Sequence, residues 1–182
     1  MMQPMRERPL FVWVEKYRPE TIDDCILPEG VTQTLNGILD TADLPNLLFT
    51  GTAGVGKTTV ARAIAKQLDL DLLMVNASDE NGIDVLRTKL KDFASSMSFE
   101  GKRKLILLDE ADYLTPNAQA VLRGLMESAH NTARFILTCN YPHKIIPALH
   151  SRCQGFHVEK LDATEFTARA ATVLVEESVE FD

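Results

Sequence analysis

The stretch Gly51-Thr-Ala-Gly-Val-Gly-Lys-Thr58 fits the spacing G-x-x-x-x-G-K-[ST] in full. It follows the apolar run 46–50 and opens a helical pattern over about 57–68, which is the strand–loop–helix context that the spacing needs. Glycines let backbone N–H groups turn toward one point, and a helix that begins there aims its positive dipole end at the same point. The sequence therefore predicts a phosphate-binding loop made of Gly51, Thr52, Ala53, Gly54, Val55, Gly56, Lys57, Thr58 and Thr59.

Two side chains of this loop have a chemical role in the prediction. The Lys57 ammonium can reach the β- and γ-phosphates of ATP, and the Thr58 hydroxyl can ligate Mg²⁺. The alternative is a chance glycine-rich turn, but average residue usage produces this spacing in roughly one random chain of this length in two hundred. We therefore predict ATP and Mg²⁺ as ligands.

Short apolar runs alternate with helical patterns along the chain. Runs that are apolar throughout are typical of strands buried on both faces, and their alternation with helices indicates a parallel sheet covered by helices. We predict an α/β fold of three layers (αβα) around a mostly parallel five-stranded sheet. The expected strands are 46–50, 72–76, 104–109, 134–138 and 154–158, and the expected helices are about 30–40, 57–68, 83–97, 116–129 and 162–177.

Composition excludes several other classes of protein. The 182 residues are 45% hydrophobic and 25% charged with a net charge of −7, which is typical of a globular domain and does not favour a small basic nucleic-acid binder. The three cysteines are far apart and form no C-x-x-C, so neither a zinc site nor a disulfide framework is expected. No apolar run approaches the roughly 20 residues of a membrane-spanning helix, and we expect an intracellular protein.

Two carboxylates, Asp109 and Glu110, stand at the end of a buried run. Ligands of open α/β sheets lie at the carboxyl ends of the strands. We predict that Asp109 holds Mg²⁺ through its water shell and that Glu110 is the general base for the attacking water. The alternative is a charge pair at a helix N-terminus. Residues 109–112 also spell the DEAD box of one helicase class, but the chain is too short for the two lobes of such helicases.

Asn140 ends the next buried run along the chain, two residues after Thr138. An amide at this place can contact the γ-phosphate or the attacking water. It can equally cap a turn before Tyr141-Pro142, and the residues alone favour neither.

Two further segments carry a resemblance to a known family. Val14-Glu-Lys-Tyr-Arg-Pro19 and Ser151-Arg-Cys153, taken with the phosphate loop, 109–112 and Asn140, resemble the clamp-loader subunits of the AAA+ class. The chain looks most like replication factor C small subunits and the equivalent bacteriophage subunit, and 21–28 favours the bacteriophage type. The resemblance implies an ATP-hydrolysing motor subunit that opens the DNA polymerase processivity clamp and places it on primed DNA.

The resemblance also implies partners and a location. The partners would be other loader subunits in a ring or spiral of five, the sliding clamp and primer–template DNA, with no membrane. The location would be the cytoplasm, which is the host's for a bacteriophage, or the nucleus in a eukaryote.

The resemblance implies roles for residues outside the phosphate loop. Asn140 would be a sensor of the γ-phosphate, and Arg152 would be an arginine finger that completes the active site of a neighbouring subunit, which makes hydrolysis depend on assembly. A surface salt bridge is the alternative for Arg152. The adenine pocket would be lined by Val14, Tyr17, Arg18 and Pro19.

The helix 116–129 and the helix that starts near Gly82 would line the inside of the ring, where primed DNA lies. Arg87, Lys89 and Lys91 would add positive charge, although one helix cannot point all three inward. Gln119 and Arg123 lie on one face of the helix 116–129, and Gln119 would couple DNA to the nucleotide site. An ordinary solvated face is the alternative for all of these residues. The acids at 79–80 oppose phosphate binding at the start of the helix near Gly82.

The expected organisation is a lead-in over 1–45 that contributes to the adenine pocket, an AAA+ core over 46–160 and an incomplete helical lid over 161–182. The family continues with the rest of the lid and a collar, so we expect an ATPase module that binds nucleotide poorly and does not assemble by itself. The rival functions are another AAA+ ATPase of DNA replication or repair, namely an initiator, helicase loader or branch-migration motor, and a structural ring subunit that binds nucleotide without hydrolysis. Intact Lys57, Asp109 and Glu110 argue against the structural subunit.

Overall fold

The structure, a computed structural model, describes residues 13–41, 43–79, 83–96, 98, 101–160 and 163–179. Five parallel strands form one sheet in the order β2-β3-β4-β1-β5. The strands are β1 (Leu47–Thr50), β2 (Asp71–Asn76), β3 (Lys104–Asp109), β4 (Ala133–Cys139) and β5 (Gln154–His157). The helices are α1 (Trp13–Lys16), α2 (Glu29–Asp40), α3 (Lys57–Gln67), α4 (Ile83–Ser95), α5 (Pro116–Ser128), α6 (Pro147–His150) and α7 (Ala163–Glu176), with 3₁₀ turns η1 (Ala111–Tyr113) and η2 (Pro142–Lys144).

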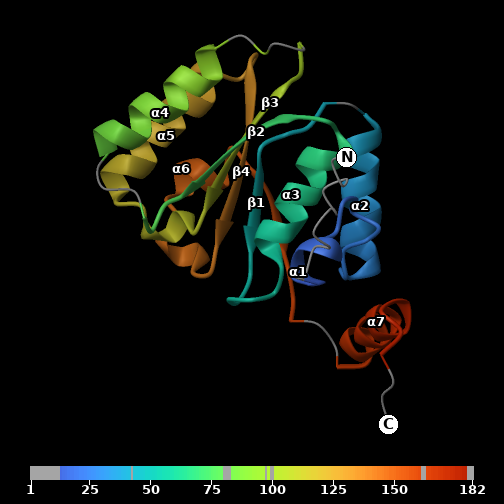
Figure 1. The fold of residues 1–182 in the computed structure, drawn as a ribbon. Helices are drawn as coiled ribbons and strands as arrows, with labels where there is room; N and C mark the ends of the chain where they lie inside the picture. Colours follow the sequence, from blue (N-terminus) through green and yellow to red (C-terminus); the bar gives the residue numbers. More distant parts are fainter. Residues whose placement is uncertain are drawn as a thin grey trace, which may run out of the picture.

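Helices cover both faces of the sheet. In Figure 1, α4 and α5 lie over one face, whereas α2 and α3 lie over the other. Alternate residues of β3 enter two separate cores: Ile106 and Leu108 pack on the side of α4 and α5, and Leu105 and Leu107 pack on the side of α2 and α3. The apolar run 104–109 is therefore buried on both faces, as its composition predicts.

The predicted α/β fold with a five-stranded parallel sheet is confirmed, and every pairing in the described sheet is parallel. The five expected helices are present with small shifts at their ends. Thr115 caps α5, because its hydroxyl accepts a hydrogen bond from the Ala118 N–H at 3.2 Å. The short elements α1, α6, η1 and η2 were not predicted, since a single turn is too short to show a periodic pattern.

The strand order brings three loops together. The phosphate loop follows β1, Glu110 follows β3 and Asn140 follows β4. These strands are neighbours in the order β3-β4-β1, and because all are parallel their carboxyl ends lie along one edge. The sheet therefore positions residues that are far apart in sequence around one point.

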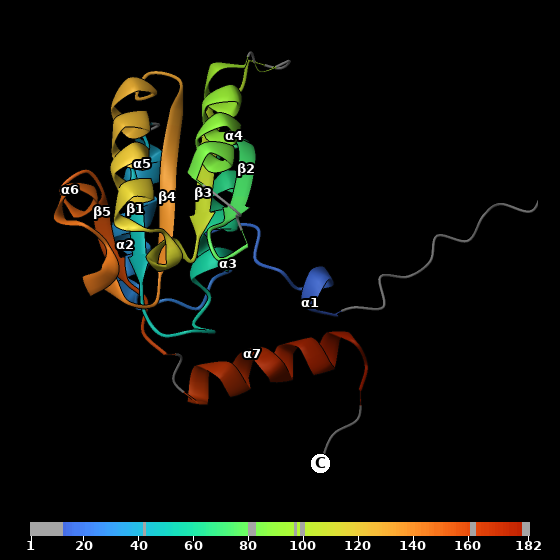
Figure 2. The same cartoon turned by 90° about the vertical axis from the view of Figure 1, so that its left-hand side faces the viewer.

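Helix α7 lies apart from the sheet and below it in Figures 1 and 2. The residues after it contact α1 and its surroundings: the Tyr17 hydroxyl donates to Glu177 Oε1 at 2.8 Å, and Lys16 Nζ lies 2.5 Å from the same oxygen. No described helix combines the length and the apolar composition that a membrane crossing requires. The division into lead-in, core and incomplete lid stays a prediction.

Candidate nucleotide-binding site

Glycine is required at the start of the phosphate loop for a steric reason. Gly51 has φ of 144°, and a Cβ atom placed on it would lie 2.2 Å from the backbone oxygen of Val158. Gly54 and Gly56 also have positive φ, at 80° and 95°, and Gly56 is the N-cap of α3. L-residues rarely adopt this conformation, so the glycine pattern follows from the backbone path of the loop. The loop ends where the amino end of α3 begins, which favours an anion at that point.

Lys57 is the first residue of α3, and only 7% of its surface is exposed. Its ammonium donates to the backbone oxygens of Gly51 and Thr52 at 2.8 and 2.7 Å, and to Asn140 Oδ1 at 2.8 Å. Burial lowers the pKa of Lys57 from its ordinary 10.5, and neighbouring acidic groups oppose this shift. The charge is thus held inside the loop by three oxygen acceptors that phosphate oxygens can replace.

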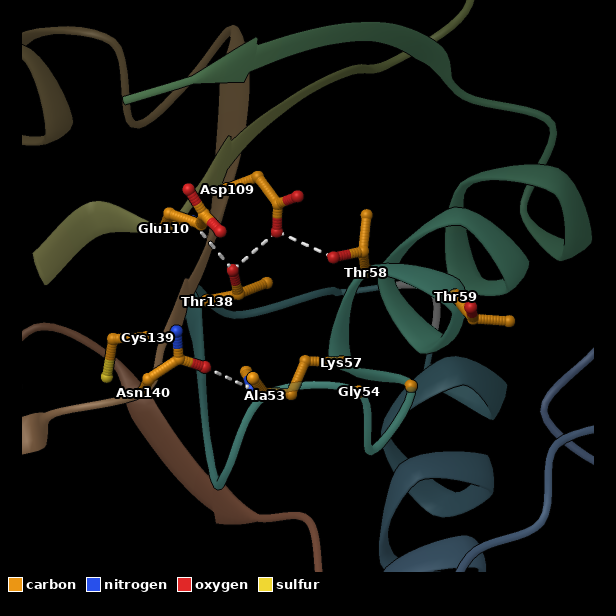
Figure 3. Close-up of a pocket in the computed structure, with 11 residues that line it drawn as sticks. Ala53, Gly54, Lys57, Thr58, Thr59, Asp109, Glu110, Thr138, Cys139 and Asn140 are labelled. Carbon is orange, nitrogen blue, oxygen red and sulfur yellow. Dashed lines mark hydrogen bonds between the residues drawn. The ribbon is translucent and has the colours of Figure 1, made fainter. Parts of the chain in front are cut away.

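Thr58 and Asp109 form the oxygen cluster of the site. The Thr58 hydroxyl donates to Asp109 Oδ1 at 2.6 Å, although the residues come from α3 and the end of β3 (Figure 3). A hydroxyl beside one carboxylate fits Mg²⁺, which takes oxygen ligands, uses one or two carboxylates and relies on waters and phosphates for the rest. In keeping with this, the described residues contain no cluster of three or more His, Cys, Asp or Glu for a metal held by protein alone.

Glu110 lies beside this cluster in an unusual backbone conformation. Its φ and ψ are 56° and 42°, which is the left-handed region that non-glycine residues seldom occupy. Its N–H donates to the Thr138 hydroxyl at 3.0 Å, which supports the turn between β3 and η1. The turn aims the carboxylate at the cavity, where it can take a proton from a water molecule (Figure 3).

Asn140 points into the site. Its Oδ1 accepts from the Lys57 ammonium, and its backbone N–H donates to Asp112 Oδ1 at 3.3 Å. The following turn η2 has Tyr141 as its N-cap and no side-chain cap hydrogen bond. The Asn140 side chain therefore does not cap this turn, which was the alternative to a role in the site.

These groups surround one cavity of about 310 Å³. Its lining comes from the phosphate loop, the end of β3 and the end of β4. Figure 3 shows Thr58, Asp109 and Thr138 pointing toward one another, and Asn140 pointing toward Lys57. The lining residues are Ala53, Gly54, Gly56, Lys57, Thr58, Thr59, Asp109, Glu110, Thr138, Cys139 and Asn140. Val55 is not among them and is buried in the core below the loop.

Tyr17, Arg18 and Pro19, three of the four residues predicted for the adenine pocket, are not among the described residues that line this cavity. Arg18 and Pro19 border a different one of about 390 Å³, with Arg62 and Met74. Tyr17 is half-buried and bonded to Glu177, and Val14 lies in α1. Their contact with adenine stays a prediction.

Among the residues predicted to face DNA, Gln119 is in a place that sequence did not suggest. It is 1% exposed, its Nε2 donates to the oxygens of Leu114 and Lys144 at 3.1 and 2.9 Å, and its Oε1 accepts from Ile146 N at 2.8 Å. The alternative of an ordinary solvated face is therefore wrong for Gln119. Its side-chain amide is buried and hydrogen-bonds backbone groups before α5 and in the η2 region.

Arg87 and Arg123 are exposed on α4 and α5, which lie side by side (Figures 1 and 2). The Nε atom of Arg123 lies 3.9 Å from the Oε1 atom of Glu127, which is one helical turn further along α5. Gly82 lies outside the described residues. Contact of these positions with DNA stays a prediction.

Arg152 lies outside its own chain's cavity. Its Nε donates to Glu127 Oε1 at 3.0 Å, its Nη2 reaches the same oxygen, and its Nη1 donates to the Ala148 oxygen at 2.8 Å. The surface salt bridge that was the alternative is thus present in the single chain. Its partner Glu127 is itself half exposed, so the arrangement leaves the guanidinium at the surface.

Three residues at the site were not predicted as functional, namely Thr138, Asp112 and Cys139, the last of which lines the cavity. Thr138 and Asp112 are 1% and 5% exposed, and each hydrogen-bonds a site residue that comes from another strand. The signal that could have revealed Thr138 is a hydroxyl directly after the apolar residues 135–137, two residues before Asn140. Asp112 Oδ2 has no hydrogen-bond partner among the described residues, which is unusual for a buried carboxylate.

Comparisons with known proteins agree with this geometry. Residues 47–159 match the profile of the ATPase family associated with various cellular activities (AAA). The chain is 46% identical over 178 residues to a probable replication factor C subunit 5 of Dictyostelium discoideum, covering 93% of this chain and 51% of the relative. It is 46% identical over 175 residues to the replication factor C small subunit of Halobacterium salinarum, covering 93% and 54%.

The chain spans about half the length of the curated relatives it matches. A solved structure, a mutant of RuvB from Thermotoga maritima, superposes with a TM-score of 0.72 over 88% of this chain and 56% of that one. At 21% identity this likeness shows the fold alone. With the family profile covering most of the chain and the phosphate loop, acids and Asn140 arranged around one cavity, the chain belongs to the AAA family of nucleotide-binding ATPases.

Proposed function

We propose that this chain is the ATPase module of a sliding-clamp loader, the machine that opens a DNA polymerase processivity clamp and places it on primed DNA. The observation that carries the proposal is the similarity to replication factor C small subunits over 93% of the chain. The site supports it, since the phosphate loop, Asp109, Glu110 and Asn140 line one cavity.

In the proposed reaction, water attacks the γ-phosphate of ATP. Glu110 orients this water and takes its proton, because its carboxylate faces the cavity beside the acid of β3. Mg²⁺ held by Thr58 and Asp109 would neutralise charge on the β- and γ-phosphates. The backbone N–H groups of the loop and the amino end of α3 hold the same phosphates.

Lys57 and Asn140 respond together to bound nucleotide in this proposal. In the structure the Lys57 ammonium donates a hydrogen bond of 2.8 Å to Asn140 Oδ1. A γ-phosphate attracts the ammonium more strongly than a neutral amide oxygen does, because a bond between two charged groups is stronger. The Asn140 side chain is then released to contact the γ-phosphate or the water, which is how it would act as a sensor.

Arg152 acts in trans in the proposed assembly. It lies at the surface and away from its own cavity, so it can enter the site of a neighbouring subunit by exchanging Glu127 for phosphate oxygens. A planar guanidinium stabilises charge on the transferring phosphoryl group. The assembly would be a ring or spiral of subunits, five by resemblance to the family.

In this proposal DNA affects the nucleotide-binding site indirectly, through Gln119, and makes no contact with Gln119 itself. Arg87, Arg123 and the start of α4 near Gly82 would meet the backbone of primed DNA, and buried Gln119 would pass a movement of α5 to η2, next to Asn140. Val14, Tyr17, Arg18 and Pro19 would contact adenine. This role implies that the protein works where DNA is replicated. That place is the cytoplasm, or the nucleus in a eukaryote.

The test uses the complete protein that contains this chain, assembled with its partner subunits. We expect ATP hydrolysis that rises when a sliding clamp and primed DNA are added together. Hydrolysis that neither of them alters would refute the clamp-loader function and leave an ATPase of another replication or repair process. Absence of any hydrolysis by an assembled complex that binds ATP would instead indicate a structural subunit.

A further inference from the structure

Thr138 is the one buried hydroxyl that reaches both acids of the site in the part of the chain that the structure describes. It lies in β4 one residue beyond the β3–β4 pair Leu108 and Leu137, and this register puts it next to Asp109. Only 1% of its surface is exposed. Its hydroxyl is thus buried in the part of β4, residues 135–139, that is otherwise apolar.

The hydrogen bonds of Thr138 reach both acids of the site. A hydroxyl has one hydrogen to donate and lone pairs that accept. Thr138 donates its hydrogen to Asp109 Oδ1 at 2.6 Å and accepts the Glu110 N–H at 3.0 Å. One atom therefore joins the acid expected to hold the metal to the backbone of the acid expected to activate water, as Figure 3 shows.

The two hydrogen bonds of Thr138 restrain the rotation of the Asp109 carboxylate and the backbone conformation of Glu110. The Thr58 hydroxyl reaches the same Asp109 oxygen at 2.6 Å, so Oδ1 is held from α3 on one side and from β4 on the other. A carboxylate bound by two hydroxyls cannot rotate without losing a charge-assisted hydrogen bond. The Glu110 N–H belongs to a residue in the left-handed conformation, which persists only where its surroundings maintain it.

We propose that Thr138 is a positioning residue for the hydrolysis reaction: its hydroxyl orients Asp109 toward the metal and maintains the backbone turn that aims Glu110 at the water. The inference rests on the ATPase function proposed above. Thr138 does not need to touch the nucleotide. It acts as hydrogen-bonding partners of metal ligands generally do, by fixing the orientation of the group that binds.

Three variants in the complete, assembled protein test the proposal. Thr138→Val removes the hydroxyl and keeps the shape, Thr138→Ser keeps the hydroxyl and removes a methyl group, and Thr132→Val makes the same replacement just before β4, away from the cavity. The first measurement is the Mg²⁺ concentration that gives half-maximal binding of a fluorescent ATP analogue. The second is steady-state hydrolysis of ATP, and thermal unfolding without nucleotide checks that each variant is folded.

For Thr138→Val we expect the half-maximal Mg²⁺ concentration to rise and kcat to fall, each by roughly 10- to 100-fold, with a smaller change in KM for ATP. Thr138→Ser and Thr132→Val are expected to stay within about threefold of the parent. Parent-like Mg²⁺ dependence and turnover in folded Thr138→Val would overturn the proposal. An equal loss in Thr138→Ser would also overturn it, because the methyl group and not the hydroxyl would then matter.

If Thr138→Val does not fold, Thr138→Ala removes the hydroxyl without placing a methyl group against the acids, and the same expectations apply to it. Failure of the proposed function is visible separately. A parent protein that hydrolyses no ATP refutes the function, while the Mg²⁺ dependence of nucleotide binding still decides whether the hydroxyl positions Asp109.

Discussion

Replacement of Arg152 by alanine separates its two roles, because the structure predicts very different magnitudes for each. In the single chain the guanidinium forms a half-exposed ion pair with Glu127, a hydrogen bond to the Ala148 oxygen and a long hydrogen bond of 3.4 Å to the Ser151 hydroxyl. An exposed ion pair contributes about 0.2–1 kcal/mol and a hydrogen bond about 0.5–1.5 kcal/mol. Arg152→Ala should therefore lower the free energy of unfolding by only about 1–3 kcal/mol.

An arginine finger is worth far more to turnover, about 10³- to 10⁵-fold in kcat. That corresponds to about 4–7 kcal/mol of transition-state stabilisation. We expect a loss of this size in the assembled complex with clamp and primed DNA, measured as single-turnover ATP hydrolysis, while urea unfolding changes little. Lys102→Ala is a suitable control, because it removes another surface ion pair, with Asp69, near the amino end of β3 and away from the cavity, and should leave hydrolysis unaffected.

Mixing two inactive variants tests whether the finger acts in trans. In a complex assembled from Arg152→Ala and Glu110→Gln subunits, some sites combine the intact Glu110 of one subunit with the intact Arg152 of its neighbour. We expect such mixtures to regain hydrolysis that neither variant shows alone. If the mixture stays inactive, or if Arg152→Ala keeps turnover within about tenfold of the parent, the finger assignment is wrong and Arg152 has only the surface role.

Further predictions concern the site itself. Glu110→Gln should lower kcat by about 10²- to 10⁴-fold because it removes the base, yet leave the Kd for ATP nearly unchanged; a matching loss of affinity in equilibrium binding would contradict this. Gly51→Ala should lower the free energy of unfolding in urea by at least about 1–3 kcal/mol, since φ is 144° and the new Cβ would meet Val158 O at 2.2 Å; parent-like stability would show that the loop takes another path. Burial lowers the pKa of Lys57, so its ammonium loses the proton at lower pH than an exposed lysine does, and ATP affinity should begin to fall below pH 10.5 as pH rises. The measurement is the Kd for ATP from neutral to alkaline pH. An affinity that does not decline before pH 10.5 would contradict a lowered pKa of Lys57.

The phosphate loop and the layers of the fold could be predicted from sequence because their determinants are local. Eight consecutive residues specify the loop, and glycine at Gly51, Gly54 and Gly56 is needed for backbone angles that belong to those residues alone. The composition of a run such as 104–109 is enough to predict a buried strand. Asp109 and Glu110 became candidates because they end such a run and ligands lie at that edge of open sheets.

The tertiary structure decided which distant residues meet. Thr138 became a partner of Asp109 and Glu110 only because β4 lies between β3 and β1 in the sheet, and no local pattern states that order. The burial of Gln119 and the pairing of Arg152 with Glu127 likewise depend on how α5 packs against the η2–α6 region. Sequence determines backbone conformation and burial pattern over a few residues, whereas hydrogen bonds between side chains depend on distances that exist only once the chain has folded.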